Sequence, residues 1–295
     1  MHNMTRILLL GKDGQLGWEL QRSLAAIGIV TALGRSEADL SQPSTLAALV
    51  AKHAPQVIVN AAAYTAVDAA ESDAHTAHSV NALAPAALAQ CAASSGALLV
   101  HYSTDYVFSG DGQVPWIESD ATAPLNVYGA SKLAGEQAIQ ASACHHLIFR
   151  TSWVYAARGG NFAKTMLRLA QERDTLSVVS DQHGAPTGAD WLADMSAHAI
   201  TQTLHTPSKS GLYHAAASGE TSWHGYASFV VQEAHQLGYP IKASTLHPVG
   251  SMAFPTPAQR PSNSRLSTQA LRHAFSVQCP PWQHGVARML AEISP

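Results

Sequence analysis

The sequence predicts an α/β fold in which a parallel sheet, covered by helices on both faces, is followed by a smaller C-terminal lobe. Short apolar runs alternate with longer helical patterns through the first part of the chain, which is typical of βαβ units. A glycine-rich turn, residues 11–17, directly follows the first of these runs. From about Gly211 the alternation loosens, and proline and histidine become frequent. Together these features predict a Rossmann-like, doubly wound parallel sheet with a substrate-binding lobe.

Composition places the chain among ordinary globular proteins. Of its 295 residues, 46% are hydrophobic and 13% are charged, and the formal net charge is -3 without a basic block. This argues against a nucleic-acid partner. The apolar run 7–10 is far too short for a signal peptide or a membrane span. The three cysteines are widely spaced, which fits free thiols in a reducing compartment. We therefore expect a cytoplasmic protein that contacts neither nucleic acid nor membrane.

The glycine-rich turn predicts a dinucleotide site. It lies between a predicted strand, 5–10, and a predicted helix, 18–26. Glycine permits a tight turn and a close approach of backbone to ligand, and the free amides at a helix N-terminus receive the negative charge of a pyrophosphate. The cofactor contacts expected here are Gly11, Gly14, Gln15, Leu16 and Gly17.

The end of the second predicted strand, 29–33, suggests which nicotinamide cofactor is used. An acidic residue at this point would bind the ribose diol of NAD. Here the strand is followed by Gly34 and Arg35, and a guanidinium can grip a 2′-phosphate in bidentate fashion. NADPH is therefore predicted to be preferred over NADH; the alternative is that Arg35 stacks on the adenine and tolerates both. Asp39, with Leu40 beside it, is placed either at the adenine edge or in a turn.

The third and fourth predicted strands lead into further site residues. Strand 57–60 opens into three alanines, whose small side chains either leave room for a ligand or allow tight packing of helix on sheet. A helical pattern follows over 67–95, broken or kinked by Pro85 near its middle. Strand 97–102 then runs into Thr104, whose hydroxyl is predicted to bond a substrate oxygen, with a capping role as the alternative.

Tyr128 and Lys132 form the predicted catalytic pair. On a helix, residues four apart lie on one face, so this spacing holds a phenol beside an ammonium. The positive charge should lower the pKa of the Tyr128 phenol from its usual value of about 10. Such a tyrosine can exchange a proton with a substrate oxygen. Tyr-x-x-x-Lys pairs also occur by chance, but the upstream Thr104 and the glycine turn favour catalysis.

Beyond this helix the chain offers fewer signals. A fifth strand, 147–151, precedes Trp153, whose indole would either stack on a sugar or base or fill the core. Helices are predicted over 161–172, with Asn161 as N-cap, and over 189–204. The candidates for the charges of a substrate diphosphate are Arg260 and Arg265, for which a solvated position is the alternative.

Domain boundaries follow from these patterns. Residues 1–151 are predicted to form the dinucleotide-binding domain, with part of 161–210 returning to it. Residues 152–160 and 211–295 are assigned mainly to the substrate-binding lobe.

Several long motifs resemble one family. The chain is similar to the extended short-chain dehydrogenase/reductases and, more narrowly, to the dTDP-4-dehydrorhamnose reductase family. The resemblance extends from the first strand to residues 260–266, nearly the whole chain. The motifs are Gly14-Gln15-Leu16-Gly17, Asn60-Ala61-Ala62-Ala63-Tyr64-Thr65-Ala66-Val67-Asp68, Ser103-Thr104-Asp105-Tyr106-Val107-Phe108, Tyr128-Gly129-Ala130-Ser131-Lys132-Leu133-Ala134-Gly135-Glu136 and Arg150-Thr151-Ser152-Trp153-Val154-Tyr155.

The resemblance implies reduction of the 4-keto group of dTDP-4-dehydro-6-deoxy-L-mannose, the last step of dTDP-L-rhamnose synthesis, with surface polysaccharide such as O-antigen as the destination. It implies that Tyr128 donates the proton, that Lys132 holds the nicotinamide ribose and tunes Tyr128, and that Thr104 supports both. The cofactor would also be lined by Ala63, Tyr64, Thr65 and Tyr102, and the sugar nucleotide would contact Thr104, Asp105 and Trp153.

The chain departs from this family at Gly34 and Arg35, where relatives often carry an acid, and this puts dual cofactor use in doubt. Some relatives hold magnesium at a dimer interface through acidic residues. Glu19, Asp190 and Glu292 would correspond here, so Mg²⁺ and a homodimer are considered, but no spacing in the sequence demonstrates a metal site.

Two rival functions share these motifs. A sugar-nucleotide epimerase or dehydratase would use the same Tyr–Lys pair and recycle its cofactor. A non-catalytic NADP-binding regulatory subunit, like the β subunit of methionine adenosyltransferase, would bind cofactor without reducing a sugar. The presence of Thr104, Tyr128 and Lys132 argues for catalysis, because a scaffold has no need of a tuned phenol.

Overall fold

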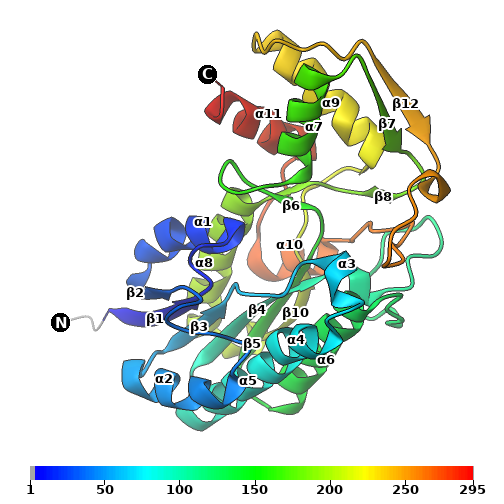
Figure 1. Ribbon diagram of the computed structural model, residues 1–295. Coiled ribbons are helices and arrows are strands. Elements are labelled where there is room, and N and C mark those ends of the chain that lie inside the picture. The colour runs from blue at the N-terminus through cyan, green and yellow to red at the C-terminus, as the bar shows by residue number, and fades with distance from the viewer. Residues whose placement is uncertain (1–3, 295) are drawn as a thin grey trace.

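The computed structural model describes residues 4–294 and is built on a six-stranded parallel sheet (Figure 1). The strand order is β10-β5-β4-β3-β1-β2, and every neighbouring pair is parallel. The strands are β1 (Thr5–Leu10), β2 (Gly28–Leu33), β3 (Val57–Asn60), β4 (Leu98–Thr104), β5 (His146–Thr151) and β10 (Gly211–His214). The predicted α/β class and parallel sheet are confirmed.

Helices cover both faces of this sheet, as an all-parallel sheet requires. One face packs against α1 (Gln15–Ala25) and α8 (Ala189–His205), and the other against α2 (Leu46–His53), α5 (Ala84–Ser95) and α6 (Val127–Ala141). Side chains alternate between the two cores along β1. Ile7 and Leu9 belong to the first, whereas Leu8 and Leu10 belong to the second.

A smaller lobe lies beyond the carboxyl edge of the sheet (Figure 1). It is built from α7 (Phe162–Glu172), α9 (Trp223–Gln236), α11 (Trp282–Glu292) and the parallel pair β7 (Thr175–Val179) and β12 (Thr245–Val249). Its core is aromatic, with Tyr155, Tyr226 and Trp282 buried together. Short strands complete it: β6 (Val154–Tyr155), β8 (His183–Gly184), β9 (Thr187–Gly188) and β11 (Thr221–Ser222).

The C-terminal third does not stay within the smaller lobe. Strand β10 pairs with β5 as the edge of the large sheet, and α10 (Gln269–Phe275) places Leu271 and Phe275 in the core of that sheet. The prediction that assigned 211–295 mainly to the lobe is therefore wrong for these two elements. Their apolar runs are short, and each finds its partner only in the fold: β10 pairs with the edge of β5, and α10 packs against β10 and α8.

The predicted helix 67–95 is divided. It forms α3 (Val67–Ala70), α4 (Ala74–His78), a π-helical turn (Ser79–Leu83) and α5. From Ala74 to Ser95 the helical turns follow one another without a gap, and the π-helical turn ends directly before Ala84 and Pro85, so the helix departs from regular α geometry next to the proline, as predicted. Three-residue 3₁₀ turns occur at Pro43–Thr45, Asp105–Val107, Pro207–Lys209 and Ser251–Ala253.

Other boundaries differ by a few residues. Helix α1 begins at Gln15, inside the glycine turn, and β4 continues to Thr104. Asn161 caps α7 as predicted, accepting a hydrogen bond from the Lys164 amide at 3.1 Å. Within residues 4–294, no helix combines the length and apolarity needed to cross a bilayer.

Candidate active site

The glycine turn lies at the point where the strand order of the sheet reverses. Strand β2 is on one side of β1 and β3 is on the other, so a crevice opens between the carboxyl ends of β1 and β3. Gly11 has φ +88°, and a Cβ there would lie 2.7 Å from the Ala62 amide nitrogen. A Cβ on Gly17 would lie 1.9 Å from the Gly11 carbonyl oxygen. Both positions therefore require glycine, and the turn brings its backbone close to the crevice.

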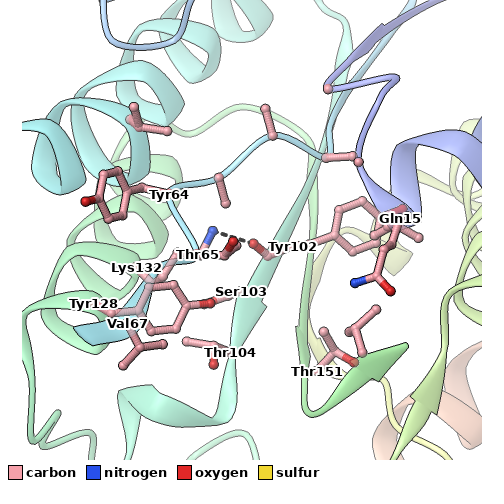
Figure 2. A pocket seen from close by; sticks show the side chains of 18 of the residues that line it. Gln15, Tyr64, Thr65, Val67, Tyr102, Ser103, Thr104, Tyr128, Lys132 and Thr151 are labelled. Atoms are coloured by element: carbon pink, nitrogen blue, oxygen red, sulfur yellow. Dashed lines mark hydrogen bonds between the residues drawn. The ribbon is translucent and has the colours of Figure 1, made fainter. Parts of the chain in front are cut away.

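A cavity of about 870 Å³ opens from this crevice toward the smaller lobe, within the usual range for ligand sites (Figure 2). Apart from the two arginines suggested for a diphosphate, all but one of the predicted catalytic, cofactor and sugar contacts line it: Gly11, Gly14, Gln15, Leu16, Arg35, Asp39, Leu40, Ala63, Tyr64, Thr65, Tyr102, Thr104, Asp105, Tyr128, Lys132 and Trp153. Gly17 is the exception, since it lies beneath the turn against Gly11. The roles of these residues stay predictions.

Local sequence holds Tyr128 and Lys132 at the cavity. Asn126 caps α6 by accepting a hydrogen bond from the Gly129 amide at 2.8 Å. A Cβ on Gly129 would lie 2.2 Å from the Tyr106 carbonyl oxygen, so α6 packs directly on the turn that follows β4. Figure 2 shows the side chains of Tyr128 and Lys132 at the same cavity as Thr104.

The expected lowering of the Tyr128 pKa is wrong. Burial raises the pKa of Tyr128 to about 12, a hydrogen bond with Thr104 lowers it in part, and the charge of Asp105 raises it. The Lys132 amine is instead directed at β4, where Nζ donates to the Tyr102 carbonyl oxygen at 2.6 Å. A phenol with this pKa keeps its proton at neutral pH, which suits a proton donor better than a base.

Burial also changes the pKa of Lys132. The residue is 1% exposed, and desolvation lowers its pKa to about 8, while the charge of Glu136 acts in the opposite direction. Glu136 is itself held by Arg150 in a buried bidentate pair, at 2.9 and 2.6 Å. The lysine is therefore close to its titration point near neutral pH, unlike a lysine at the surface.

Asp105 brings a carboxyl group with a raised pKa to the cavity. It is 2% exposed, and burial raises its pKa to about 7, partly offset by hydrogen bonds with Ser264 and Thr104. The Thr104 hydroxyl donates to Oδ1 at 3.1 Å, whereas Oδ2 is buried without a hydrogen-bond partner among residues 4–294.

The ribose end of the cavity is open. The Arg35 side chain is 81% exposed and lies 3.7 Å from Asp39. Asp39 accepts hydrogen bonds from the Ser41 amide and hydroxyl at 3.0 and 2.8 Å, and the amide bond is the main cause of its lowered pKa. Asp39 therefore stabilises the turn and also lines the cavity, so the two alternatives for it are compatible.

Trp153 forms an aromatic wall with a residue that the sequence did not reveal. Its ring stacks on that of Trp223, with centroids 3.7 Å apart and planes at 16°. Trp153 has φ +48°, a conformation rare for a bulky side chain and one that the surrounding structure must maintain. Trp223, at the start of α9, also lines the cavity and donates from Nε1 to Gln182 at 3.1 Å. No motif marks Trp223, because only the fold brings it to Trp153.

The two arginines suggested for a diphosphate are not in the cavity wall. Arg260 makes a bidentate pair with Asp68, at 3.2 and 2.8 Å, and Arg265 pairs with Glu220. Neither is among the lining residues. Each guanidinium instead ties the extended C-terminal segment to another part of the chain, so the expected diphosphate contact is not supported.

The residues considered for magnesium do not fit a metal site. Glu19 lies within electrostatic reach of Asp190 and Glu292, whose charges help to raise its pKa, although burial is the main cause. Asp190, however, is paired with Arg288 at 2.9 Å. Within residues 4–294, no cluster of three or more histidine, cysteine or acidic side chains could hold a metal ion. Nothing in the structure supports bound Mg²⁺.

The class of protein follows from the position of this cavity. It joins a glycine turn at the switch point of a parallel sheet to a threonine, a tyrosine and a lysine that can complete a hydride transfer. This is a Rossmann-type, nicotinamide-dependent oxidoreductase.

Comparison with known proteins gives the particular family. The family model described as RmlD substrate binding domain matches residues 4–294, and the chain belongs to that family. It is 55% identical over 291 residues to dTDP-4-dehydrorhamnose reductase of Salmonella typhimurium, covering 97% of each chain. The identity is 54% with the Escherichia coli K12 reductase, again over 97% of each chain.

Solved structures agree. The crystal structure of dTDP-4-dehydrorhamnose reductase from Bacillus anthracis, in complex with NADP, superposes with a TM-score of 0.89 at 37% identity, covering 98% of this chain and 99% of that one. A UDP-glucose 4-epimerase from Thermus thermophilus, in complex with NAD, has a TM-score of 0.79 at 18% identity over 98% of each chain. The latter shows a shared fold alone.

Proposed function

We propose that the protein reduces the 4-keto group of dTDP-4-dehydro-6-deoxy-L-mannose to give dTDP-L-rhamnose, using NADPH or NADH. The observation that carries this proposal is the single cavity shared by the glycine turn and by Thr104, Tyr128 and Lys132. The names of the curated relatives support the substrate.

The residues of the chain act on the keto oxygen. Bound nicotinamide supplies the hydride that reaches the keto carbon. Negative charge would then grow on the oxygen, where Tyr128 would donate its proton. The Thr104 hydroxyl, whose one proton is directed at Asp105 Oδ1 in the structure, would turn to donate a hydrogen bond to the same oxygen. The ammonium form of Lys132 opposes the negative charge left on Tyr128, as well as binding the nicotinamide ribose. Because burial holds the pKa of Tyr128 at about 12, the phenol is protonated before each turnover.

NADPH is the preferred cofactor in this proposal. Arg35 stands at the ribose end of the cavity and no carboxylate follows β2 directly, so a 2′-phosphate would meet the exposed guanidinium of Arg35, whose present partner, Asp39, is 3.7 Å away. The NADP bound by the Bacillus anthracis relative supports the assignment.

The sugar nucleotide would occupy the end of the cavity nearer the smaller lobe. Asp105 lines the cavity there, and the edge of the Trp153–Trp223 stack offers an apolar surface. The reaction would take place in the cytoplasm, and assembly as a homodimer is part of the proposal that the structure of one chain does not address.

The test is a spectrophotometric assay of nicotinamide oxidation with the dTDP-keto sugar, run with each cofactor. We expect cofactor oxidation in proportion to product, with a higher kcat/KM for NADPH. A higher kcat/KM for NADH would contradict the proposed role of Arg35 in binding the 2′-phosphate. Turnover without net oxidation would indicate an epimerase or dehydratase, and tight cofactor binding without turnover would indicate a regulatory subunit.

A further inference from the structure

A buried polar chain lies behind Lys132 and has no part in the mechanism described above. Lys132 Nζ is 3.2 Å from Nε2 of His101, and Nδ1 of His101 is 3.2 Å from Nδ2 of Asn60. All three residues are at most 1% exposed. Asn60 and His101 are directly paired across β3 and β4, so the sheet itself fixes their separation.

The backbone determines which way the Asn60 amide points. Oδ1 of Asn60 accepts a hydrogen bond from the Ala62 amide at 3.2 Å, and a backbone N–H can only donate. The NH₂ group of Asn60 must therefore face His101 and donate to Nδ1. A neutral imidazole that accepts at Nδ1 carries its proton on Nε2.

The Nε2 proton of His101 then points at the Lys132 amine. An uncharged amine accepts this hydrogen bond with its lone pair while it donates to the Tyr102 carbonyl oxygen. An ammonium has no lone pair, so a charged Lys132 would place one of its N–H groups against the Nε2–H of His101. A second proton on His101 gives no relief, and burial together with the charge of Lys132 holds the pKa of His101 well below its usual value.

We infer that Asn60 fixes His101 in the tautomer with its proton on Nε2, an arrangement that we call the tautomer lock. The lock disfavours the ammonium form of Lys132 and thereby sets the upper pH limit of the reaction. His101 is a positioning residue in this scheme, since it acts on Lys132 and does not line the cavity. The role in turnover rests on the proposed function, because it requires that the Lys132 ammonium oppose charge on Tyr128.

Other ionisable groups around Lys132 do not replace the lock. Glu136, on the same helix, favours the ammonium form, but its carboxylate is engaged on both oxygens by Arg150 of β5. Asp105, at the end of β4, is charged above its pKa of about 7, but it is not among the causes of the Lys132 pKa shift, nor is Lys132 among the causes of the Asp105 shift. Tyr128 is a neutral phenol at working pH. The contacts of His101 and Tyr102 thus act directly on the amine.

The lock can be tested without any turnover. Long-range ¹H–¹⁵N NMR of histidine-labelled protein reports the tautomer of each ring, and His101 can be assigned through its backbone amide. We expect neutral His101 with the proton on Nε2 from pH 6 to 9. A proton on Nδ1, or a charged ring, would overturn the inference. This outcome is decisive even if the proposed substrate is wrong.

A substitution should reverse the lock. In Asn60→Asp the new carboxylate still accepts a hydrogen bond from the Ala62 amide and can also accept one from Nδ1–H of His101. The tautomer with its proton on Nδ1 leaves Nε2 free to accept a hydrogen bond from a Lys132 ammonium. The high-pH limb of the kcat profile should move upward by about one pH unit. An unmoved limb would contradict the lock.

A double-mutant cycle separates the lock from the mere addition of negative charge. In a His101→Phe background, Asn60→Asp should no longer move the limb. A shift that persists without His101 would show that charge alone is responsible and would overturn the inference. If these variants do not fold, the NMR measurement on the unaltered protein decides whether His101 carries its proton on Nε2, as the lock requires. An unaltered protein that shows no reduction would refute the proposed function and leave the NMR result intact.

Discussion

The two ends of the cavity are built in different ways. At the cofactor end, the part of the wall that follows β1 is the backbone of the glycine turn, and Gly11 and Gly17 are required because a Cβ would collide with neighbouring backbone. At the substrate end, the wall consists of side chains, and Trp153 and Trp223 come from segments about 70 residues apart in sequence. A single added methyl group, as in a glycine-to-alanine substitution, would therefore disrupt the cofactor end. The shape of the substrate end depends on the position of the smaller lobe.

This difference explains what each end can do. A backbone wall suits a pyrophosphate, which is common to many cofactors and enzymes. A side-chain wall suits a particular sugar nucleotide, because its polar and aromatic groups can be matched to one substrate. Tyr128 stands where the two walls meet, so changes there should affect chemistry more than binding.

The largest effect is expected at that junction. Tyr128→Phe removes the proton donor and keeps the ring, so kcat should fall by about 10²–10⁴-fold with little change in NADPH affinity. Steady-state kinetics and cofactor titration by fluorescence measure the two quantities. Unchanged kcat would refute the assignment, and a large loss of cofactor affinity would show that binding and chemistry are not separable here.

Gly17→Ala should damage the cofactor wall through folding. The new Cβ would lie 1.9 Å from the Gly11 carbonyl oxygen, so the turn must open, and we expect a loss of about 1–3 kcal/mol in the free energy of unfolding. Gly14→Ala is the matched control, since its Cβ would meet the same oxygen at an ordinary 3.5 Å. Equal losses in urea unfolding of the two variants would contradict the account of this wall.

Asp105→Asn, a change at the substrate end, should raise the free energy of unfolding by an amount that increases with pH. The pKa of Asp105 is about 7 in the folded protein, against an ordinary value of 3.8 for an aspartate, so the folded state binds the proton more tightly than the unfolded chain does. The wild type loses stability as pH rises from about 4 to 7, and the variant does not. The difference should be near zero at pH 4 and reach about 1–3 kcal/mol at pH 8. Exposed Asp111→Asn is the control, and a pH-independent difference for Asp105→Asn would be evidence against a raised pKa.

Trp223→Leu should have the smallest effect and should be confined to the substrate end. Trp153 would lose its stacked partner, and KM for the sugar nucleotide should rise about tenfold while cofactor affinity is unchanged. Trp18→Leu, a change to a half-exposed tryptophan outside the cavity, should leave KM unaltered. A KM for Trp223→Leu equal to wild type would mean that the stack does not shape the substrate end.

The sequence predicted the cofactor end far better than the substrate end. Gly11, Gly14 and their neighbours form a local motif whose strand–turn–helix context is visible in a few residues. Tyr128 and Lys132 were placed at one cavity by helical spacing, but the direction of the Tyr128 pKa was wrong because spacing does not report burial. Trp223 was missed, and Arg260 was misplaced, because their partners Trp153 and Asp68 are distant in sequence.

The most direct test of the proposed reduction is the fate of the cofactor hydride. With NADPH carrying deuterium at the transferred position, mass spectrometry and NMR of the product should show one deuterium per sugar, bonded to C4, and an equal amount of oxidised cofactor. Product without deuterium, or deuterium retained in the cofactor after turnover, would contradict a direct reduction at this site.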